Sequence, residues 1–356
     1  MNSTEMIKDI YEIQFPELGW KIHIDPTAFT IAGIDIQWYA LIIISGLLLA
    51  MLYCFPRMKK FGVDSDKAID AVIGGVIGGI IGARVYYVLM NLSDYKKDTF
   101  SASLIAAINI RSGGLAIYGG IIGAVIVGLT ICGIKKIKIL PMLDISVIGF
   151  LIGQGIGRWG NFVNQEAFGT NTDFVLGMTG GRIQRTISSG MQAGGSMFEN
   201  GLNMVWEQPV HPCFLYESVW CLLGFVILAI FAKHRKYDGQ LLLMYMTWYG
   251  AERAVVEGLR TDSLMIGSIR VSQAVSIIIL AASVILQIIM GFKVKRDPES
   301  CVLYCNTPEA VAMLEEARRR KIGIEDDNEV IEHIISDDDE PNAAVHETAA
   351  ENKEDL

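Results

Sequence analysis

The stretch GRWGNFVNQEAFG, residues 157–169, places an arginine, two asparagines, a glutamine and a glutamate at the end of a long apolar segment. A charged side chain near the centre of a bilayer costs about 2.5–3.5 kcal/mol on insertion scales, so this placement needs a reason. A guanidinium group binds phosphate through paired hydrogen bonds and keeps its charge when it is partly desolvated. Arg158, with Asn161 one helical turn later, therefore indicates an anion site at the edge of an apolar helix.

A second polar motif, TWYGAERAVVEGLR, lies in residues 247–260. Tyr249, Arg253 and Glu257 are spaced by four residues and would form one stripe of a helix. Arg260, seven residues after Arg253, falls on the same side. Because two arginines and one glutamate cannot neutralise each other, the stripe keeps a positive charge that an anionic partner would balance.

A third motif, HPCFLYES, brings His211, Tyr216 and Glu217 to the start of another apolar segment. Two structural explanations could account for any single charged residue of these motifs: an ion pair that holds two helices together, or a side chain that reaches back to water at the end of a span. The same explanations apply to Arg84, Asp144 and Glu252. The gathering of three motifs at one predicted depth instead favours recognition of a phospholipid head group. On these residues alone, a lipid enzyme and a transporter both remain open.

The elements that must position these residues are membrane helices. Of the 356 residues, 51% are hydrophobic and 19% are charged, a composition typical of membrane proteins. Seven segments are apolar over the roughly 20 residues that a bilayer core requires. They cover residues 36–55, 68–90, 115–134, 141–160, 213–232, 239–256 and 271–292. We therefore expect an all-α integral membrane protein whose catalytic or binding domain is residues 1–296.

Basic clusters follow every odd-numbered segment, for example Lys135, Lys136 and Lys138 after the third. Because cytoplasmic loops are rich in lysine and arginine, this pattern predicts an N-terminus outside and a C-terminus in the cytoplasm. The linker at residues 161–212 would then lie on the outer face. All three polar motifs would face the outer leaflet.

Glycines recur every four residues in two of the segments, at Gly74, Gly78 and Gly82 and at Gly149, Gly153 and Gly157. Small residues at this spacing let helix backbones approach closely in lipid. We interpret both series as packing surfaces.

Residues 297–356 hold 18 acidic and 5 basic residues, so the net charge of −9 for the whole chain describes this tail more than the membrane segments. We expect a largely disordered cytoplasmic tail with one helix over residues 307–321. The six cysteines have no metal-ligand spacing, and we expect no metal and no cofactor. The first 35 residues lack the pattern of a cleavable signal peptide.

The three motifs, together with QWYA at residues 37–40 and GGLAIYGG at residues 113–120, closely resemble the signatures of the prolipoprotein diacylglyceryl transferases of bacteria. The resemblance covers nearly all of residues 20–290 in the expected order. It implies transfer of the sn-1,2-diacylglyceryl group from phosphatidylglycerol to the lipobox cysteine of a prolipoprotein signal peptide. A thioether forms and glycerol 1-phosphate leaves. It also implies a multi-pass protein of the bacterial plasma (inner) membrane, with the lipid bilayer as a partner and no nucleic acid.

The resemblance assigns roles position by position. Arg158 and Arg253 match arginines that bind phosphatidylglycerol. Asn161, Glu166 and Gly169 match further signature positions, and Tyr39 matches a tyrosine of the first span. Tyr249, Glu257 and Arg260 match the set of the sixth span, and His211 is expected near the bound lipid.

One position departs from the family pattern. Some members carry a histidine, regarded as a candidate base, where this chain has Tyr118. A tyrosine has a reference pKa of about 10, which is poorly matched to a base at neutral pH. Tyr118 then serves mainly as a hydrogen-bonding group, or the thiol proton passes to a carboxylate or to His211.

A transporter of anions or phospholipids is the alternative that uses the same arginines. Such proteins often carry paired internal repeats. The odd number of predicted spans and the dissimilar halves of this chain argue against that alternative, and a purely structural scaffold does not explain polar residues gathered at one depth. The sequence therefore favours the transferase.

Overall fold

The computed structural model describes residues 6–96, 99–109, 113–193, 204–261, 265–266 and 269–322. Contacts between residues divide the chain into a compact unit that ends at Thr307 and a second one that begins at Pro308. In the second unit, α12 covers Pro308–Ile322, close to the helix expected at residues 307–321. The predicted disorder of the tail concerns residues 323–356, which lie outside the described residues.

All seven predicted spans are helical. They correspond to α1 (Trp38–Cys54), α2 (Ser65–Met90), α5 (Ile117–Ile134), α6 (Ile139–Asn164), α9 (Cys213–Phe231), α10 (Gln240–Leu259) and α11 (Val271–Arg296). A seven-residue 3₁₀ segment, Phe55–Phe61, extends α1, and a three-residue 3₁₀ turn, Ala232–His234, extends α9. Two short helices, α3 (Leu92–Tyr95) and α4 (Phe100–Ile108), lie between α2 and α5.

Six helices of the described residues are long and apolar enough to cross a membrane, and α10 is not among them. The reason is the charge that α10 carries: Glu252, Arg253 and Glu257 interrupt its apolar sequence. The outward surfaces of the other helices are apolar, as Ile81 on α2, Ile126 on α5 and Ile278 on α11 illustrate, each more than half exposed. The chain is therefore a mainly helical, multi-pass membrane protein.

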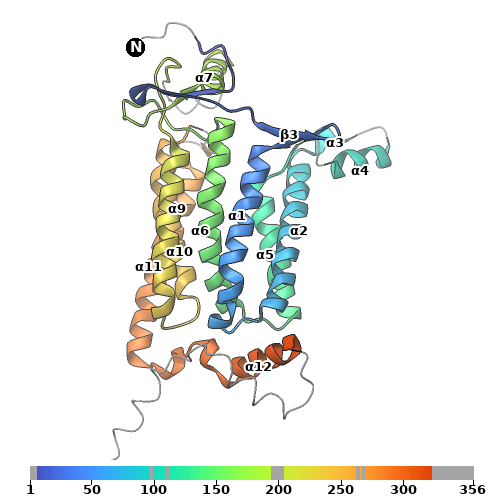
Figure 1. Ribbon diagram of the computed structural model, residues 1–356, viewed down its shortest axis with the longest axis vertical. Coiled ribbons are helices and arrows are strands. Elements are labelled where there is room, and N and C mark those ends of the chain that lie inside the picture. Colours follow the sequence, from blue (N-terminus) through green and yellow to red (C-terminus); the bar gives the residue numbers. More distant parts are fainter. Residues whose placement is uncertain are drawn as a thin grey trace, which may run out of the picture. The chain divides into compact units, whose positions relative to one another are not determined.

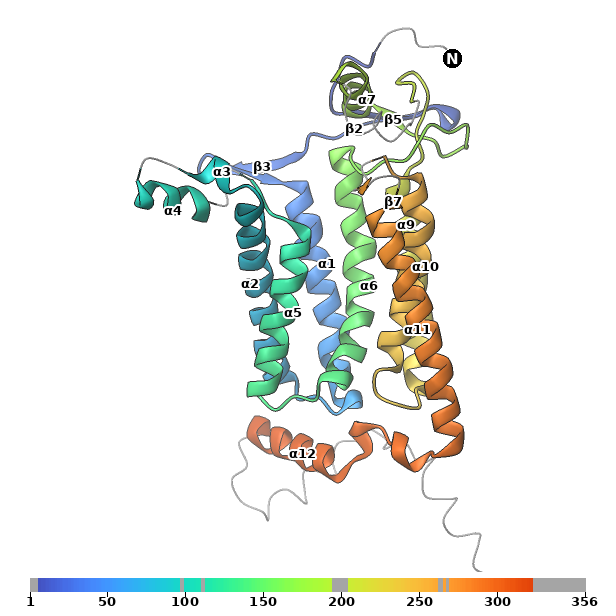
Figure 2. The same cartoon turned by 180° about the vertical axis from the view of Figure 1, so that it is seen from behind.

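The helix α6 is the centre of this arrangement. It lies between a group formed by α1, α2 and α5 and a group formed by α9, α10 and α11 (Figures 1 and 2). It is also the most buried of the six apolar helices. One face of α6 packs against α1 and another against α9, so residues on α6 can contact both groups.

The backbones of α2 and α5 approach each other closely. A Cβ atom on Gly82 would collide with the carbonyl oxygen of Gly119, and one on Gly123 with that of Gly78. The predicted packing role of Gly78 and Gly82 is therefore confirmed. On α6 the same prediction is only partly right, because a Cβ on Gly149 would lie 2.9 Å from the Cys54 sulfur while Gly157 has no atom within 4 Å.

Asp144 of α6 holds the first turn of α10. Its carboxylate oxygens accept hydrogen bonds from the backbone N–H groups of Gly239 at 2.8 Å and Leu242 at 2.9 Å. These N–H groups belong to the helix start, where no carbonyl of the helix itself is available. A buried acid on one membrane helix thus caps another, which accounts for the charge at residue 144.

Short strands, which the all-α expectation did not include, cover one end of the helices. β1 (Glu12–Phe15) pairs antiparallel with β2 (Trp20–His23) and with β5 (Thr179–Gly180), giving the order β2-β1-β5. A hairpin of β3 (Thr27–Ile31) and β4 (Ile34–Gln37) leads into α1, and β6 (Met265–Ile266) pairs with β7 (Ile269–Arg270) before α11. A 3₁₀ turn at Pro16–Leu18 connects β1 to β2.

The segment expected as an outer-face linker, residues 161–212, contains β5 and the helix α7 (Gly181–Ala193). Because β5 pairs with β1, the N-terminal residues and this segment form one small sheet near α7. Its core joins Ile13 and Met178 to Phe162 of α6 and Phe214 of α9. The sheet is therefore packed directly on the ends of the two helices that carry the polar motifs.

After α11, two 3₁₀ turns (Glu299–Cys301 and Tyr304–Asn306) return to the connection between α9 and α10. Asp238 accepts a hydrogen bond from the backbone N–H of Tyr304 at 2.8 Å. Arg235 donates to the backbone carbonyl of Lys60 and lies over the Phe61 ring. These contacts fasten the ends of α1, α9 and α11 to one another.

Candidate functional site

The arginines of the first two motifs converge on Glu217, a fully buried carboxylate of α9. Arg158 Nη1 lies 2.9 Å from Glu217 Oε2, and Arg253 Nη1 donates to Glu217 Oε1 at 3.0 Å. Arg260 Nη1 is 3.6 Å from the same Oε1. Three helices, α6, α9 and α10, therefore meet in one ion-paired group.

Glu257 extends this group along α10. Its Oε2 is 2.5 Å from Arg253 Nη2, the pairing expected from the four-residue spacing. Arg270 donates to the backbone carbonyl of Glu257. We call the five residues Arg158, Glu217, Arg253, Glu257 and Arg260 the arginine–glutamate cluster.

The cluster contains three guanidinium groups and two carboxylates, so it carries one unbalanced positive charge. The side chain of Arg158 is 21% exposed, that of Arg253 is 15% exposed and that of Arg260 is 11% exposed. Arg158 is thus the most accessible. A partly buried cationic site of this kind suits a phosphate group, since guanidinium groups are strong, directional donors to phosphate oxygens.

The polar motif after Arg158 forms the end of α6. Gln165 ends the helix in the left-handed conformation, with φ of 52°, and its side chain donates to the carbonyl of Ile10 and accepts from the N–H of Arg182. The turn brings Glu166 back toward the helix, where it accepts hydrogen bonds from Asn161 at 3.0 Å and Asn164 at 3.3 Å. Asn161 and Glu166 therefore pair with each other.

Tyr39 lies between these two groups. A Cβ on Gly160 would stand 2.6 Å from its ring, which places the tyrosine directly against α6. Glu166 and Arg158 are its charged neighbours. The first-span tyrosine thus adjoins the signature motif.

Gly169 connects the turn to the ends of two other elements. It forms an antiparallel bridge with Arg260, and its N–H donates to the carbonyl of His211 at 3.0 Å. A Cβ here would lie 2.8 Å from His211 Cβ and 3.0 Å from the Cys213 sulfur. Only glycine, which has no Cβ, fits this close to His211 and Cys213. His211 and Arg260 therefore lie on either side of the turn that contains Gly169.

His211 contacts Tyr216 through Nδ1, at 3.1 Å from the hydroxyl oxygen. Burial lowers the pKa of His211 below its usual value, so the ring is neutral at neutral pH. A neutral imidazole has a nitrogen that accepts a proton.

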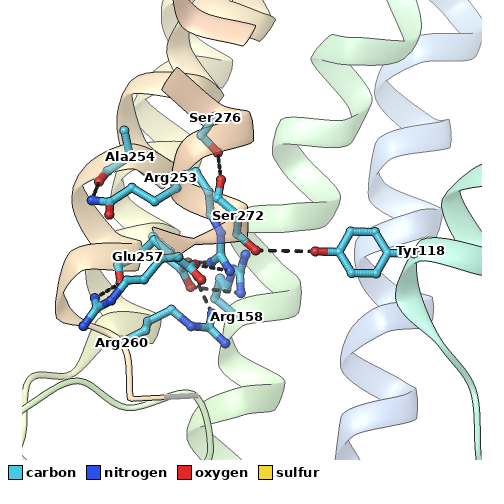
Figure 3. A network of polar contacts seen from close by, with 11 residues as sticks. Tyr118, Arg158, Arg253, Ala254, Glu257, Arg260, Ser272 and Ser276 are labelled. Carbon is cyan, nitrogen blue, oxygen red and sulfur yellow. Dashed lines mark hydrogen bonds and ion pairs between the residues drawn. The ribbon is translucent and has the colours of Figure 1, made fainter. Parts of the chain in front are cut away.

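Tyr118 lies apart from the cluster. It extends from the first turn of α5 toward α11, and its hydroxyl is 3.4 Å from that of Ser272, at the start of α11 (Figure 3). Tyr118 is 46% exposed. Its contact thus links the α1, α2 and α5 group to the helix that packs on α10.

Tyr249 stacks on Tyr245, with ring centroids 5.9 Å apart, and has Arg253 and Arg158 as charged neighbours. The sequence motifs therefore identified the arginines and tyrosines of this region. They did not assign a role to Glu217, which lies within ion-pair distance of all three arginines. Its position in HPCFLYES, at the depth of the other motifs, was the signal for such a role.

Comparison with known proteins gives one consistent result. A family model described as prolipoprotein diacylglyceryl transferase matches residues 26–289. The curated phosphatidylglycerol–prolipoprotein diacylglyceryl transferase of Finegoldia magna is 42% identical over 265 residues, which are 74% of this chain and 95% of that protein. The proteins of the same name from Clostridioides difficile and Listeria innocua are each 36% identical, over 77% of this chain and 98% and 92% of their own lengths.

The match spans every helix from α1 to α10 and most of α11, and it includes each residue of the arginine–glutamate cluster. The chain belongs to the prolipoprotein diacylglyceryl transferase family.

Proposed function

We propose that this protein transfers the sn-1,2-diacylglyceryl group of phosphatidylglycerol to the lipobox cysteine in the signal peptide of prolipoproteins. The sulfur–carbon bond forms as the bond between the glyceryl carbon and the phosphate oxygen breaks. The electron pair of that bond stays on the phosphate, and glycerol 1-phosphate leaves. The thiol proton is lost, because the thiolate is the nucleophile.

The observation that carries this proposal is the arginine–glutamate cluster, with one unbalanced positive charge among apolar helices. The leaving phosphate gains negative charge as the carbon–oxygen bond breaks. Guanidinium groups already fixed by Glu217 and Glu257 would stabilise that charge without further reorganisation. In this proposal Arg158 and Arg253 contact the phosphate, and Arg260 supports them.

Other residues have supporting roles. Asn161 and Glu166, paired at the end of α6, would orient the glycerol or the helix end. Tyr39, Tyr249 and Gly169 would shape the lipid site around the arginines. Tyr118 would serve mainly as a hydrogen-bonding group, or the thiol proton would pass to His211 or to a carboxylate of the site.

We also propose that α10 crosses the membrane as the seventh span. Arg253 pairs with Glu217 of α9 and Glu257 pairs with Arg253, so these charges need not face lipid. The N-terminus would lie outside and the C-terminus in the cytoplasm, because the basic clusters follow α1, α5, α9 and α11. The site would then be reached from the outer leaflet of the bacterial plasma membrane, where both substrates arrive laterally.

The test uses purified full-length protein, radiolabelled phosphatidylglycerol and a lipobox peptide with one cysteine. We expect label on the peptide, release of glycerol phosphate and no transfer to a peptide with Cys→Ser. Arg158→Ala and Arg253→Ala should each lower the rate by roughly 100-fold or more, the loss typical of a charge-stabilising donor. Both variants should still insert into the membrane.

Activity close to that of the unmodified protein in either arginine variant would overturn its assignment to the phosphate. Bound phosphatidylglycerol without any transfer would instead favour the transporter alternative.

A further inference from the structure

Two buried side-chain oxygens beside the arginine–glutamate cluster have no hydrogen-bond donor among the residues that the structure describes. They are Oε1 of Gln154 on α6 and Oε1 of Glu252 on α10. Glu252 is only 4% exposed. Polar atoms in protein interiors are almost always paired, so two unpaired acceptors in one region require an explanation.

Both oxygens belong to one small group between α6 and α10. Gln154 Nε2 donates to the hydroxyl of Tyr245 at 2.9 Å, and Tyr245 stacks on Tyr249. Glu252 is a charged neighbour of both tyrosines. We call Gln154, Tyr245, Tyr249 and Glu252 the inner polar cluster.

The inner polar cluster adjoins the proposed phosphate site. Gln154 precedes Arg158 by four residues on α6, which places it about one helical turn, or 5.4 Å, along the same face. Glu252 precedes Arg253 in the chain. Its charged neighbours are Glu217, which repels its negative charge, and Arg158, Arg253 and Arg260, which attract it.

We propose that the inner polar cluster binds the two free hydroxyl groups of the glycerol head group and so selects phosphatidylglycerol as the donor lipid. This inference rests on the proposed function. The head-group glycerol is bonded directly to the phosphate, so its hydroxyls reach the residues that adjoin the phosphate site. Each hydroxyl carries a donor, and Gln154 and Glu252 each present an unpaired acceptor.

The unpaired acceptors favour a head group that carries hydroxyls. A hydroxyl donates a hydrogen bond to Gln154 Oε1 or Glu252 Oε1 without bringing a charge. A lipid without head-group hydroxyls leaves both acceptors unpaired, and the site therefore discriminates against it.

The experiment compares two donors of identical acyl chains, phosphatidylglycerol and phosphatidyl-n-propanol, which has the same three carbons without hydroxyls. Transfer to the lipobox peptide is measured as kcat/KM for the unmodified protein, Gln154→Leu and Glu252→Leu. We expect the unmodified protein to prefer phosphatidylglycerol by at least roughly tenfold. In each variant the preference should fall below roughly threefold, because the rate with phosphatidylglycerol drops while the rate with phosphatidyl-n-propanol stays the same.

Gln287→Leu is the matched control. Gln287 of α11 donates to Thr247 of α10 at 2.6 Å, so this variant also removes a buried amide contact of α10 but lies outside both clusters. It should change the rates with both donors by the same factor and leave the preference intact.

Equal losses with both donors in Gln154→Leu and Glu252→Leu would show a structural role and overturn the inference. An unmodified protein that uses both donors equally well would overturn it without any variant, which covers the case in which a variant fails to fold. Absence of transfer from either donor is a different result, because it contradicts the proposed function itself.

Discussion

At the scale of single residues, Glu217 has the most consequential environment in the protein. It is fully buried on α9 and lies within ion-pair distance of arginines on α6 and α10. Removing one partner of a buried ion pair leaves uncompensated charge, which typically costs about 3–5 kcal/mol. Glu217 therefore holds the arginines at their mutual distances against their own repulsion.

We predict that Glu217→Ala destabilises the protein by roughly 3–5 kcal/mol and removes transfer activity. The measurement is thermal unfolding in detergent, together with the transfer assay. Asp70→Ala is a suitable control, because Asp70 pairs with Lys135 at a half-exposed position where an ion pair contributes at most about 1 kcal/mol. A Glu217→Ala protein as stable as this control would contradict the role given to Glu217.

The titration of His211 makes the stability of the folded protein depend on pH. Its pKa is lowered in the folded protein by burial, so the unfolded chain binds a proton more readily. The stability contributed by the neutral ring is complete above the unfolded pKa of about 6.5 and declines as the pH falls below it. We predict that, between about pH 7.5 and about pH 5.5, the unmodified protein loses more thermal stability than His211→Gln.

The control for this prediction is Tyr216→Phe, which removes the hydroxyl contact to His211 but keeps the titrating ring. It should retain the pH dependence. The same decline in His211→Gln as in the unmodified protein would assign the effect to another group.

The sequence predicted the arginines of the site and the pairing of Arg253 with Glu257, but not the pairing of the arginines with Glu217, and the reason is physical. The spacing of Arg253 and Glu257 on one helix fixes their contact in advance. The contacts of Glu217 and Glu252 depend on how α6, α9 and α10 pack, which no spacing within one helix encodes. The departure at Tyr118 was visible in the sequence, whereas its contact with Ser272, 154 residues away, was not.

At the scale of elements, α2 and α5 depend on glycine at specific positions. Gly82 and Gly123 lie where the two backbones approach each other, while Gly75 has space for a methyl group, with its nearest neighbour, the carbonyl oxygen of Ala124, at 3.5 Å. The four-residue spacing predicted this contact correctly. It did not distinguish contact positions from open ones, since Gly157 continues the α6 series without a neighbour.

We predict that Gly82→Ala destabilises the protein by roughly 1–3 kcal/mol, because the added Cβ forces the helices apart. Gly75→Ala on the same helix should be neutral or stabilising, since alanine is the better helix former. Thermal unfolding of both variants in detergent gives the comparison. Equal stability of the two variants would exclude close packing as the function of Gly82.

At the scale of the whole molecule, the hydropathy of the chain predicted the helices well. Each predicted span matches a helix, because about 20 apolar residues in lipid can satisfy their backbone groups only as a helix. The strands at one end were not predicted. β5 has two residues and is defined by pairing with β1, more than 160 positions earlier, so no local pattern indicates it.

The direction of the chain across the membrane is open to a direct test. In a chain whose six native cysteines are replaced, we predict that Asp173→Cys reacts with an impermeant maleimide in intact cells. Lys236→Cys, between α9 and α10, should react only after the membrane is permeabilised. Both side chains are exposed, so access depends on the side of the membrane and not on burial. The reverse pattern would invert the proposed topology.

The cap that Asp144 provides for α10 has a consequence for biosynthesis. As the proposed seventh span, α10 carries three charges, each of which opposes insertion. Its start is held by Asp144 of α6, and its Arg253 pairs with Glu217 of α9. The ribosome makes α6 and α9 first, so these partners are already available when α10 emerges. A rearranged gene that translated α10 before α6 would encode the same contacts but present the helix to the membrane without them. In the proposed topology, the order of the helices in the gene is thus part of how the least apolar one is inserted.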